Sequence, residues 1–259
     1  MTPVSQTEAA GGGAYLRRIR LTADGGEVLA ELEDDFHHFE VRLKHDGQRV
    51  TGIRSAAIRY PWSTCPLAGD RLEALKGMRL SPRSTAHAAV ASPRSNCTHM
   101  FDLAGLAVAH AAAQRSVRQY DVRIPDRQGN RTTATLHQNA ELVLRWEVAG
   151  REIIDPPPYA GQRLRGARFI EWAESRLEPD EAEAALVLRR ALDIGMGRGM
   201  DLDPYPNAAA IAEMVGPVCF TFHPDQASHG TRMRGTTWDF AANPDLLLSG
   251  LTENPAPRP

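Results

Sequence analysis

Residues 93–116, PRSNCTHMFDLAGLAVAHAAAQRS, form the most apolar helical segment of the chain, and the other predicted elements are placed relative to it. Its apolar side chains recur every three or four positions, and Ser95 or Asn96 can cap the first turn by accepting a backbone N–H. Extending the apolar stripe to both ends adds two imidazoles, His99 and His110, to the core-facing side. The sequence therefore predicts a buried central helix with His99 near its start and His110 near its end.

Three side chains at the start of this segment, Cys97, His99 and Asp102, form the main candidate site. Asp102 follows His99 at a spacing that brings both onto neighbouring helical turns, so the carboxylate can hold the imidazole in one tautomer as a general base. The alternative is a core-edge histidine that bonds to backbone. Cys97 falls in the first turn, where the helix dipole favours a thiolate, and it is a weaker candidate for a nucleophile.

The same segment also allows a metal site. Cys97 and His99 form a CxH pair, and two distant cysteines, Cys65 and Cys219, could complete a ligand set in space. Structural zinc normally uses two pairs of closely spaced ligands, so a single CxH pair is a weak signal. Metal binding is the minority interpretation, and simple burial of the cysteines is the main one.

Residues 15–60 alternate apolar and polar side chains, which is typical of half-buried antiparallel strands, with a hairpin turn at Asp46-Gly47. In the run FHHFEVRLK, His37 shares a face with Phe39 and is predicted to point toward the core. His38 faces the opposite way, toward water. A buried imidazole is costly without a partner, so His37 is a second candidate site residue.

The alternation returns after residue 116 in three further runs and a short fourth, and the chain becomes helical from Arg168, with Pro179 at a helix start. The predicted class is therefore α+β: antiparallel strands in two blocks curled around a central helix, with a helical C-terminal appendix from about residue 166. We expect one domain over residues 14–250, and disordered ends at 1–13 and 251–259.

Composition excludes several kinds of partner. The chain has 259 residues, 42% apolar, with 30 basic and 32 acidic residues and a net charge of −2, so no global field favours nucleic acid or an anionic membrane. No run approaches the roughly 20 apolar residues of a membrane span, and no secretory leader is recognisable at the start. The three cysteines are far apart, which favours reduced thiols. We expect a soluble cytoplasmic protein with a small-molecule substrate, and the oligomeric state stays open.

Two further side chains belong to the candidate site. Arg59, beside Pro61 and Trp62, could bind an oxyanion or carboxylate, although an ordinary surface arginine is the competing interpretation. Tyr159, in the rigid connector DPPPYAG, could be a phenolic acid, a pocket wall or only part of a stiff link. The glycine-rich run at 194–200 follows a helix rather than a strand, so no nucleotide cofactor is indicated.

The segments RYPWSTCPLAG at 59–69, SNCTHMFDLAG at 95–105 and LRWEVAGREIIDPPPYAG at 144–161 resemble a bacterial family classified as domain of unknown function 2889. The resemblance extends over most of residues 15–250. It implies that Cys65, Cys97 and His99 stand in family-typical places and that such proteins accompany aromatic-compound and acyl-thioester catabolism. It implies no mechanism.

The resulting hypothesis is a cofactor-free, metal-free lyase or isomerase that acts on a hydroxylated aromatic or acyl molecule. His99 oriented by Asp102 would move the proton, with His37 or Tyr159 as the complementary acid and Arg59 at the oxyanion. Retro-aldol loss of formaldehyde from a lignin-type aromatic needs only such groups. The alternatives are a metal-dependent hydrolase with a Cys/His site and a non-catalytic ligand-binding protein.

Overall fold

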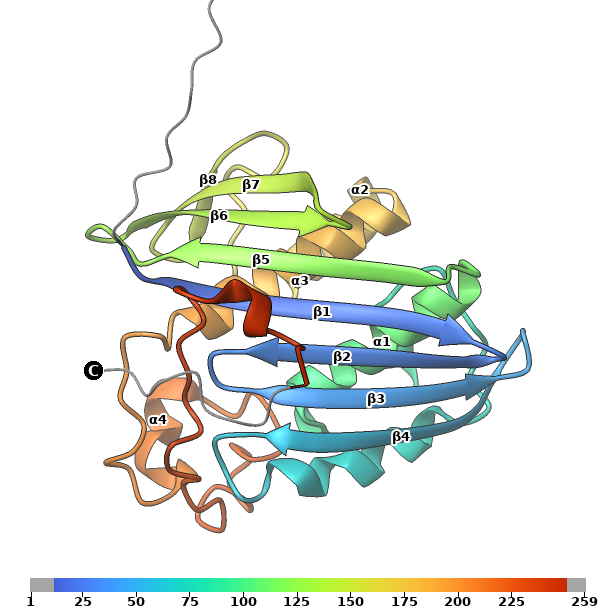
Figure 1. Ribbon diagram of the computed structural model, residues 1–259, viewed down its shortest axis with the longest axis horizontal. Helices are drawn as coiled ribbons and strands as arrows, with labels where there is room; N and C mark the ends of the chain where they lie inside the picture. The colour runs from blue at the N-terminus through green and yellow to red at the C-terminus, as the bar shows by residue number, and fades with distance from the viewer. Residues whose placement is uncertain (1–11, 251–259) are drawn as a thin grey trace, which may run out of the picture.

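The computed structural model describes residues 12–250, in which eight antiparallel strands form one open sheet in the order β4-β3-β2-β1-β5-β6-β7-β8 (Figure 1). The strands are β1 Ala14–Asp24, β2 Glu27–Asp34, β3 His38–His45, β4 Val50–Arg59, β5 Val117–Pro125, β6 Arg131–Gln138, β7 Glu141–Ala149 and β8 Glu152–Asp155. β1 joins the two predicted strand blocks, because Arg17 lies opposite Asp34 of β2 and opposite Val122 of β5. The α+β class is confirmed.

Alternation decides which face of each strand is buried. On β3, Phe39, Val41 and Leu43 are fully buried, whereas Arg42 and Lys44 between them are exposed. The hairpin to β4 turns at Gly47, whose φ of +90° lies in a region that side chains with a Cβ rarely adopt.

One face of the sheet is covered by helices, which lie behind it in Figure 1. Helix α1, Thr98–Ala112, packs against β1, β2 and β3, and α3, Pro179–Gly195, packs against β5, β6 and β7. Helix α2, Arg168–Arg176, packs on α3. The C-terminal helices are therefore no appendix: α3 buries Leu188 and Leu192 and forms, with α1, the second layer.

Local details differ from the predicted elements. The N-cap of α1 is Cys97, two residues beyond Ser95 and one beyond Asn96, whose side-chain amide donates to the carbonyl of Ser92 at 2.8 Å. Short helical turns, most of them of the 3-10 type, fill the connections. These are η1 Cys65–Leu75, η2 Ala86–Ala89, η3 Pro93–Ser95, η4 Ala208–Ile211, α4 Ala212–Val215 and η5 Pro244–Leu246.

The opposite face of β1 is covered by the C-terminal segment, which crosses in front of the sheet in Figure 1. There Phe240 and Leu247 pack against Ala14 and Leu16. The ends predicted to be disordered, 1–13 and 251–259, fall almost wholly outside the described residues. Within residues 12–250, no helix has the length and apolarity needed to cross a membrane.

Candidate active site

A cavity of about 330 Å³ opens where the first turn of α1, the β2–β3 turn and the C-terminal end of α3 meet. Its walls are mainly apolar and include Phe36, Trp62, Leu202, Val215 and Phe222. Its buried inner side carries His37, Cys65, Cys97 and His99, and its outer side carries Arg151 and Arg165. We call it the His37 cavity. Few polar groups in an apolar hollow are typical of small-molecule sites.

His37 is fixed by Asp34, the last residue of β2. One carboxylate oxygen of Asp34, Oδ1, accepts the backbone N–H groups of Phe36 and His37, both at 2.8 Å, and closes the turn into β3. The same oxygen lies 3.0 Å from Nδ1 of the His37 ring. Because an ionised carboxylate only accepts hydrogen bonds, Nδ1 carries the proton and Nε2 keeps its lone pair.

The second oxygen of Asp34, Oδ2, accepts from β1. The Tyr15 hydroxyl donates to it at 2.7 Å, and the Arg17 guanidinium donates at 2.6 Å. Burial alone would raise the pKa of Asp34, but His37 and Arg17 outweigh burial and hold this pKa well below its ordinary value. Asp34 is therefore a buried, ionised group that orients His37.

His99, in the first turn of α1, lies directly against His37. The ring centroids are 3.8 Å apart, and the Phe39 ring is 5.7 Å from each imidazole. Nε2 of His99 is buried and has no hydrogen-bond partner among residues 12–250. Burial lowers the pKa of His37 and lowers that of His99 well below its ordinary value, so both rings are neutral at pH 7.

The cysteines of the His37 cavity are thiols rather than thiolates. Burial raises the pKa of Cys97 well above its ordinary value and that of Cys65 to about 12. The prediction of a thiolate at Cys97 is therefore wrong, because burial in this apolar cavity outweighs the effect of the helix dipole on the pKa. The Cys97 sulfur lies 4.0 Å from Nδ1 of His99.

The cysteines also do not form the metal site considered above. Within the described part of the chain, the potential ligand atoms that lie within 4.8 Å of one another belong to Asp34, His37 and His99, with no cysteine among them. This donor set fits a metal poorly, because both oxygens of Asp34 already accept hydrogen bonds from neutral and cationic donors. A metal would have to displace Arg17 from a buried carboxylate.

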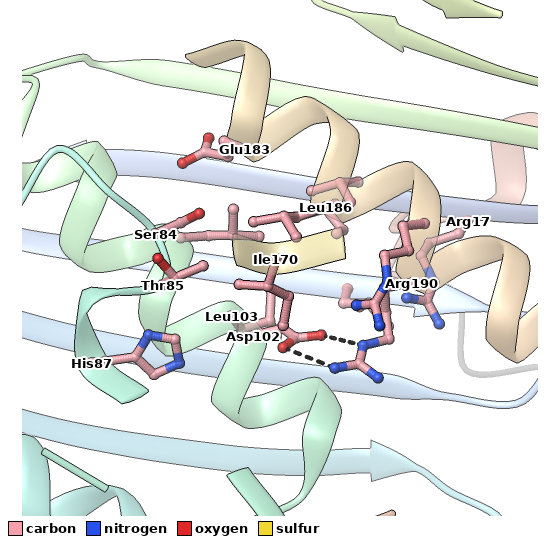
Figure 2. A pocket seen from close by; sticks show the side chains of 15 residues that line it. Arg17, Ser84, Thr85, His87, Asp102, Leu103, Ile170, Glu183, Leu186 and Arg190 are labelled. Atoms are coloured by element: carbon pink, nitrogen blue, oxygen red, sulfur yellow. Dashed lines mark hydrogen bonds and ion pairs between the residues drawn. The ribbon is translucent and has the colours of Figure 1, made fainter. Parts of the chain in front are cut away.

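Asp102 does not hold His99. Its carboxylate accepts from Nε of Arg190 in α3 at 2.7 Å, as Figure 2 shows, beside a smaller cavity of about 80 Å³ between α1 and α3. The prediction failed because it considered only neighbours on the same helix. Helix α3 supplies Arg190, a cationic partner that binds the Asp102 carboxylate more strongly than a neutral imidazole would. Asp34 takes the predicted role instead.

Arg59 and Tyr159 do not line the His37 cavity either. Arg59 is buried between the carbonyl of Asp35, at 3.1 Å, and that of Thr236, at 2.9 Å, and lies 4.2 Å from the Trp238 ring. It therefore clamps the C-terminal segment onto the sheet. Tyr159 packs against aromatic rings, with its centroid 5.0 Å from that of Trp146.

Sequence reasoning gave no role to Asp34, Arg151 or Arg165. A signal existed for Asp34, since an Asp that ends a strand three residues before an inward-facing histidine can close the turn and reach the ring. No signal marked the two arginines, which lie far from the other site residues in sequence and reach the cavity only through the sheet.

The fold and site define a class: an open antiparallel sheet with one helical layer and an apolar cavity that ends in a buried Asp-His-His group. Residues 20–114 match the family described as protein of unknown function (DUF2889). This stretch includes Asp34, His37, Cys97 and His99, whereas the cavity walls from α3 and beyond lie outside it. No curated protein matches the chain.

Proposed function

We propose that the protein is a cofactor-free lyase or isomerase that acts on a hydroxylated aromatic or acyl molecule by general acid–base catalysis. The observation that carries the proposal is His37, a neutral imidazole held at Nδ1 by ionised Asp34, on the buried side of an apolar cavity. A base that is already deprotonated and fixed in one tautomer is prepared to accept a proton at Nε2.

His99 is the second participant. Its ring packs on His37, and its buried Nε2 has no partner among the described residues, so a substrate oxygen in the cavity would satisfy it. In this arrangement His37 removes the proton, and His99 hydrogen-bonds the oxygen on which charge develops. Exclusion of water by the apolar walls strengthens both interactions.

A retro-aldol cleavage fits these groups. The hydroxyl proton of a CH₂OH substituent moves to His37, the adjacent C–C bond breaks, and formaldehyde leaves. The electron pair of the broken bond stays on the carbon next to the aromatic ring, which then takes the proton back from His37. The reaction needs no oxidant, reductant or water. An isomerisation would instead return the proton to a different carbon.

The test is formaldehyde release from a panel of lignin-type aromatics that carry a hydroxymethyl group, with substrate and product isomers followed by chromatography. We expect His37→Gln and His99→Gln each to lower the rate by at least about 100-fold, the usual contribution of general acid–base groups. His38→Gln is the matched control, because the adjacent ring lies on the opposite face beside Glu33. Equal rates in all three variants would contradict the proposal.

A second candidate is a non-catalytic binding protein, favoured by the predominance of apolar side chains around the cavity. In that case His37→Gln would bind ligand normally and affinity would follow the apolarity of the ligand.

A metal-dependent hydrolase is tested by elemental analysis of protein purified without chelator. A stoichiometric metal lost in His99→Gln would replace the cofactor-free proposal.

A further inference from the structure

Two arginines reach the outer side of the His37 cavity from the second half of the sheet. Arg151 lies in the turn between β7 and β8, and Arg165 lies in the loop that follows β8. The backbone holds them together: the N–H of Leu164 donates to the carbonyl of Arg151 at 2.9 Å, and Glu152 forms a β-bridge with Arg163. Their position is therefore set by the sheet.

The charges on the cavity wall do not balance. Of the side chains that line it, Arg151 and Arg165 are cationic and Asp193 is the acidic one. Asp193 is already paired with Arg165 at 2.6 Å. The side chain of Arg151 is exposed and has no hydrogen-bond or ion-pair partner among the described residues. The outer side of an apolar cavity thus carries one solvent-exposed guanidinium without a protein counter-ion among the described residues.

We infer that Arg151, with Arg165 beside it, binds an anionic oxygen group, so that the substrate class is an aromatic or acyl anion such as a carboxylate. This inference rests on the proposed function for the identity of the cavity as the substrate site. A guanidinium presents planar N–H donors that match a carboxylate, and the apolar walls accept the uncharged body of the molecule. The anionic group orients the opposite end of the substrate toward His37 and His99.

A pair of fluorescent probes separates charge from apolarity. 1-Anilinonaphthalene-8-sulfonate and N-phenyl-1-naphthylamine share the same ring system, and only the first carries an anionic group. We expect wild-type protein to bind the sulfonate more tightly. Arg151→Gln should weaken the sulfonate by about tenfold, as expected for loss of a charge-assisted hydrogen bond, and should change the neutral probe by less than twofold. Fluorescence titration measures both.

Arg145→Gln is the matched control, because this exposed arginine on β7 does not line the cavity and its replacement changes net charge equally. Circular dichroism and thermal melting verify that each variant is folded. Unchanged sulfonate affinity in Arg151→Gln, an equal loss for both probes, or no saturable sulfonate binding to wild-type protein would overturn the inference.

The two proposals fail separately. If sulfonate binding depends on Arg151 while His37→Gln and His99→Gln leave turnover of an anionic aromatic unchanged, the anion site stands and the catalytic proposal falls. If turnover depends on the histidines but neutral and anionic substrates have the same KM in wild-type and Arg151→Gln protein, the catalytic proposal stands and the anion site falls.

Discussion

At the scale of single residues, the site depends on how Asp34 divides its two oxygens. One oxygen closes the β2–β3 turn and orients His37, and the other neutralises Arg17, which is almost fully buried. A buried ion pair contributes little net stability compared with an apolar pair, but removing one partner leaves an unpaired charge that is costly. Asp34 therefore links the stability of the sheet to the orientation of the imidazole.

Asp34→Asn tests this link. We expect the free energy of unfolding to fall by about 3–5 kcal/mol, because Arg17 loses its buried counter-ion. Asp121→Asn is the control, since Asp121 forms a partly exposed pair with Arg18 and should contribute at most about 1 kcal/mol. Urea denaturation of both variants measures the difference. Similar losses of unfolding free energy in the two variants would show that the buried pair contributes no more to stability than the partly exposed one.

The pH dependence of turnover follows from the lowered pKa values. A base works only when it is deprotonated, so the rate is full above the pKa of His37 and falls as pH drops through it. Because burial lowers this pKa, the acid limb of kcat/KM should lie below pH 6.5, the ordinary histidine value. A pH–rate profile decides. Activity that instead disappears as pH rises through 7 would indicate that an imidazolium acts as an acid.

At the scale of elements, α1 lies close to the preceding connection at Gly105. A Cβ built on Gly105 would lie 2.1 Å from the carbonyl oxygen of Ser84 and 2.4 Å from the His87 ring. Glycine in a helix is unfavourable by itself, at about 1 kcal/mol relative to alanine. The close approach of segment 84–87 to the helix is the reason that this position accepts no side chain.

For Gly105→Ala, helix propensity and tertiary packing predict opposite changes in the free energy of unfolding. Helix propensity predicts stabilisation, whereas the backbone contact predicts a loss of about 1–3 kcal/mol, the usual cost of overpacking. We expect the loss, measured as a lower midpoint in thermal or urea unfolding. Gly199→Ala is the control, because no atom lies within 4 Å of the place that its new methyl group would take and its φ is not positive. Stabilisation by Gly105→Ala would show that segment 84–87 can move away.

At the scale of the whole molecule, the fold buries several imidazoles in neutral form. Burial lowers the pKa of His37, His99 and His110, and lowers that of His87 to about 4. In the unfolded chain these groups take up protons near pH 6.5, before the folded protein does. At a pH between the lowered pKa of each folded-state histidine and 6.5, the unfolded state therefore binds more protons than the folded state. The free energy of unfolding consequently falls as pH drops from about 6.5.

His87 should account for a definite part of this acid sensitivity. Its pKa shift from 6.5 to about 4 corresponds to about 3 kcal/mol lost across that window. In His87→Gln, the slope of unfolding free energy against pH should be shallower between pH 6 and 4, whatever the variant's stability at pH 7. Gln48→Ala, which removes no titratable group and lies at an exposed position, should leave the slope unchanged. An unaltered slope in His87→Gln would contradict the prediction.

The local elements of this protein, and the side chains that each one buries, could be predicted from the order of its residues. Alternation identified the strands and turned His37 inward, and helical periodicity identified α1 and placed His99 on its buried side. Pro179 marked the start of α3 correctly. These features depend on neighbours within a few residues, where backbone geometry fixes which side chains share a face.

The partners of these side chains depend on the packing of segments that are distant in the chain. The sequence predicted that Asp102 holds His99, but Asp102 forms an ion pair with Arg190 of α3. Asp34 instead binds Arg17 of β1 through one oxygen and His37 through the other. Arg151 reaches the cavity because β7 and β8 extend the same sheet. The physical reason is that hydrogen bonds and ion pairs are short-range and directional, so their partners are chosen by how distant segments pack and not by their spacing along the chain.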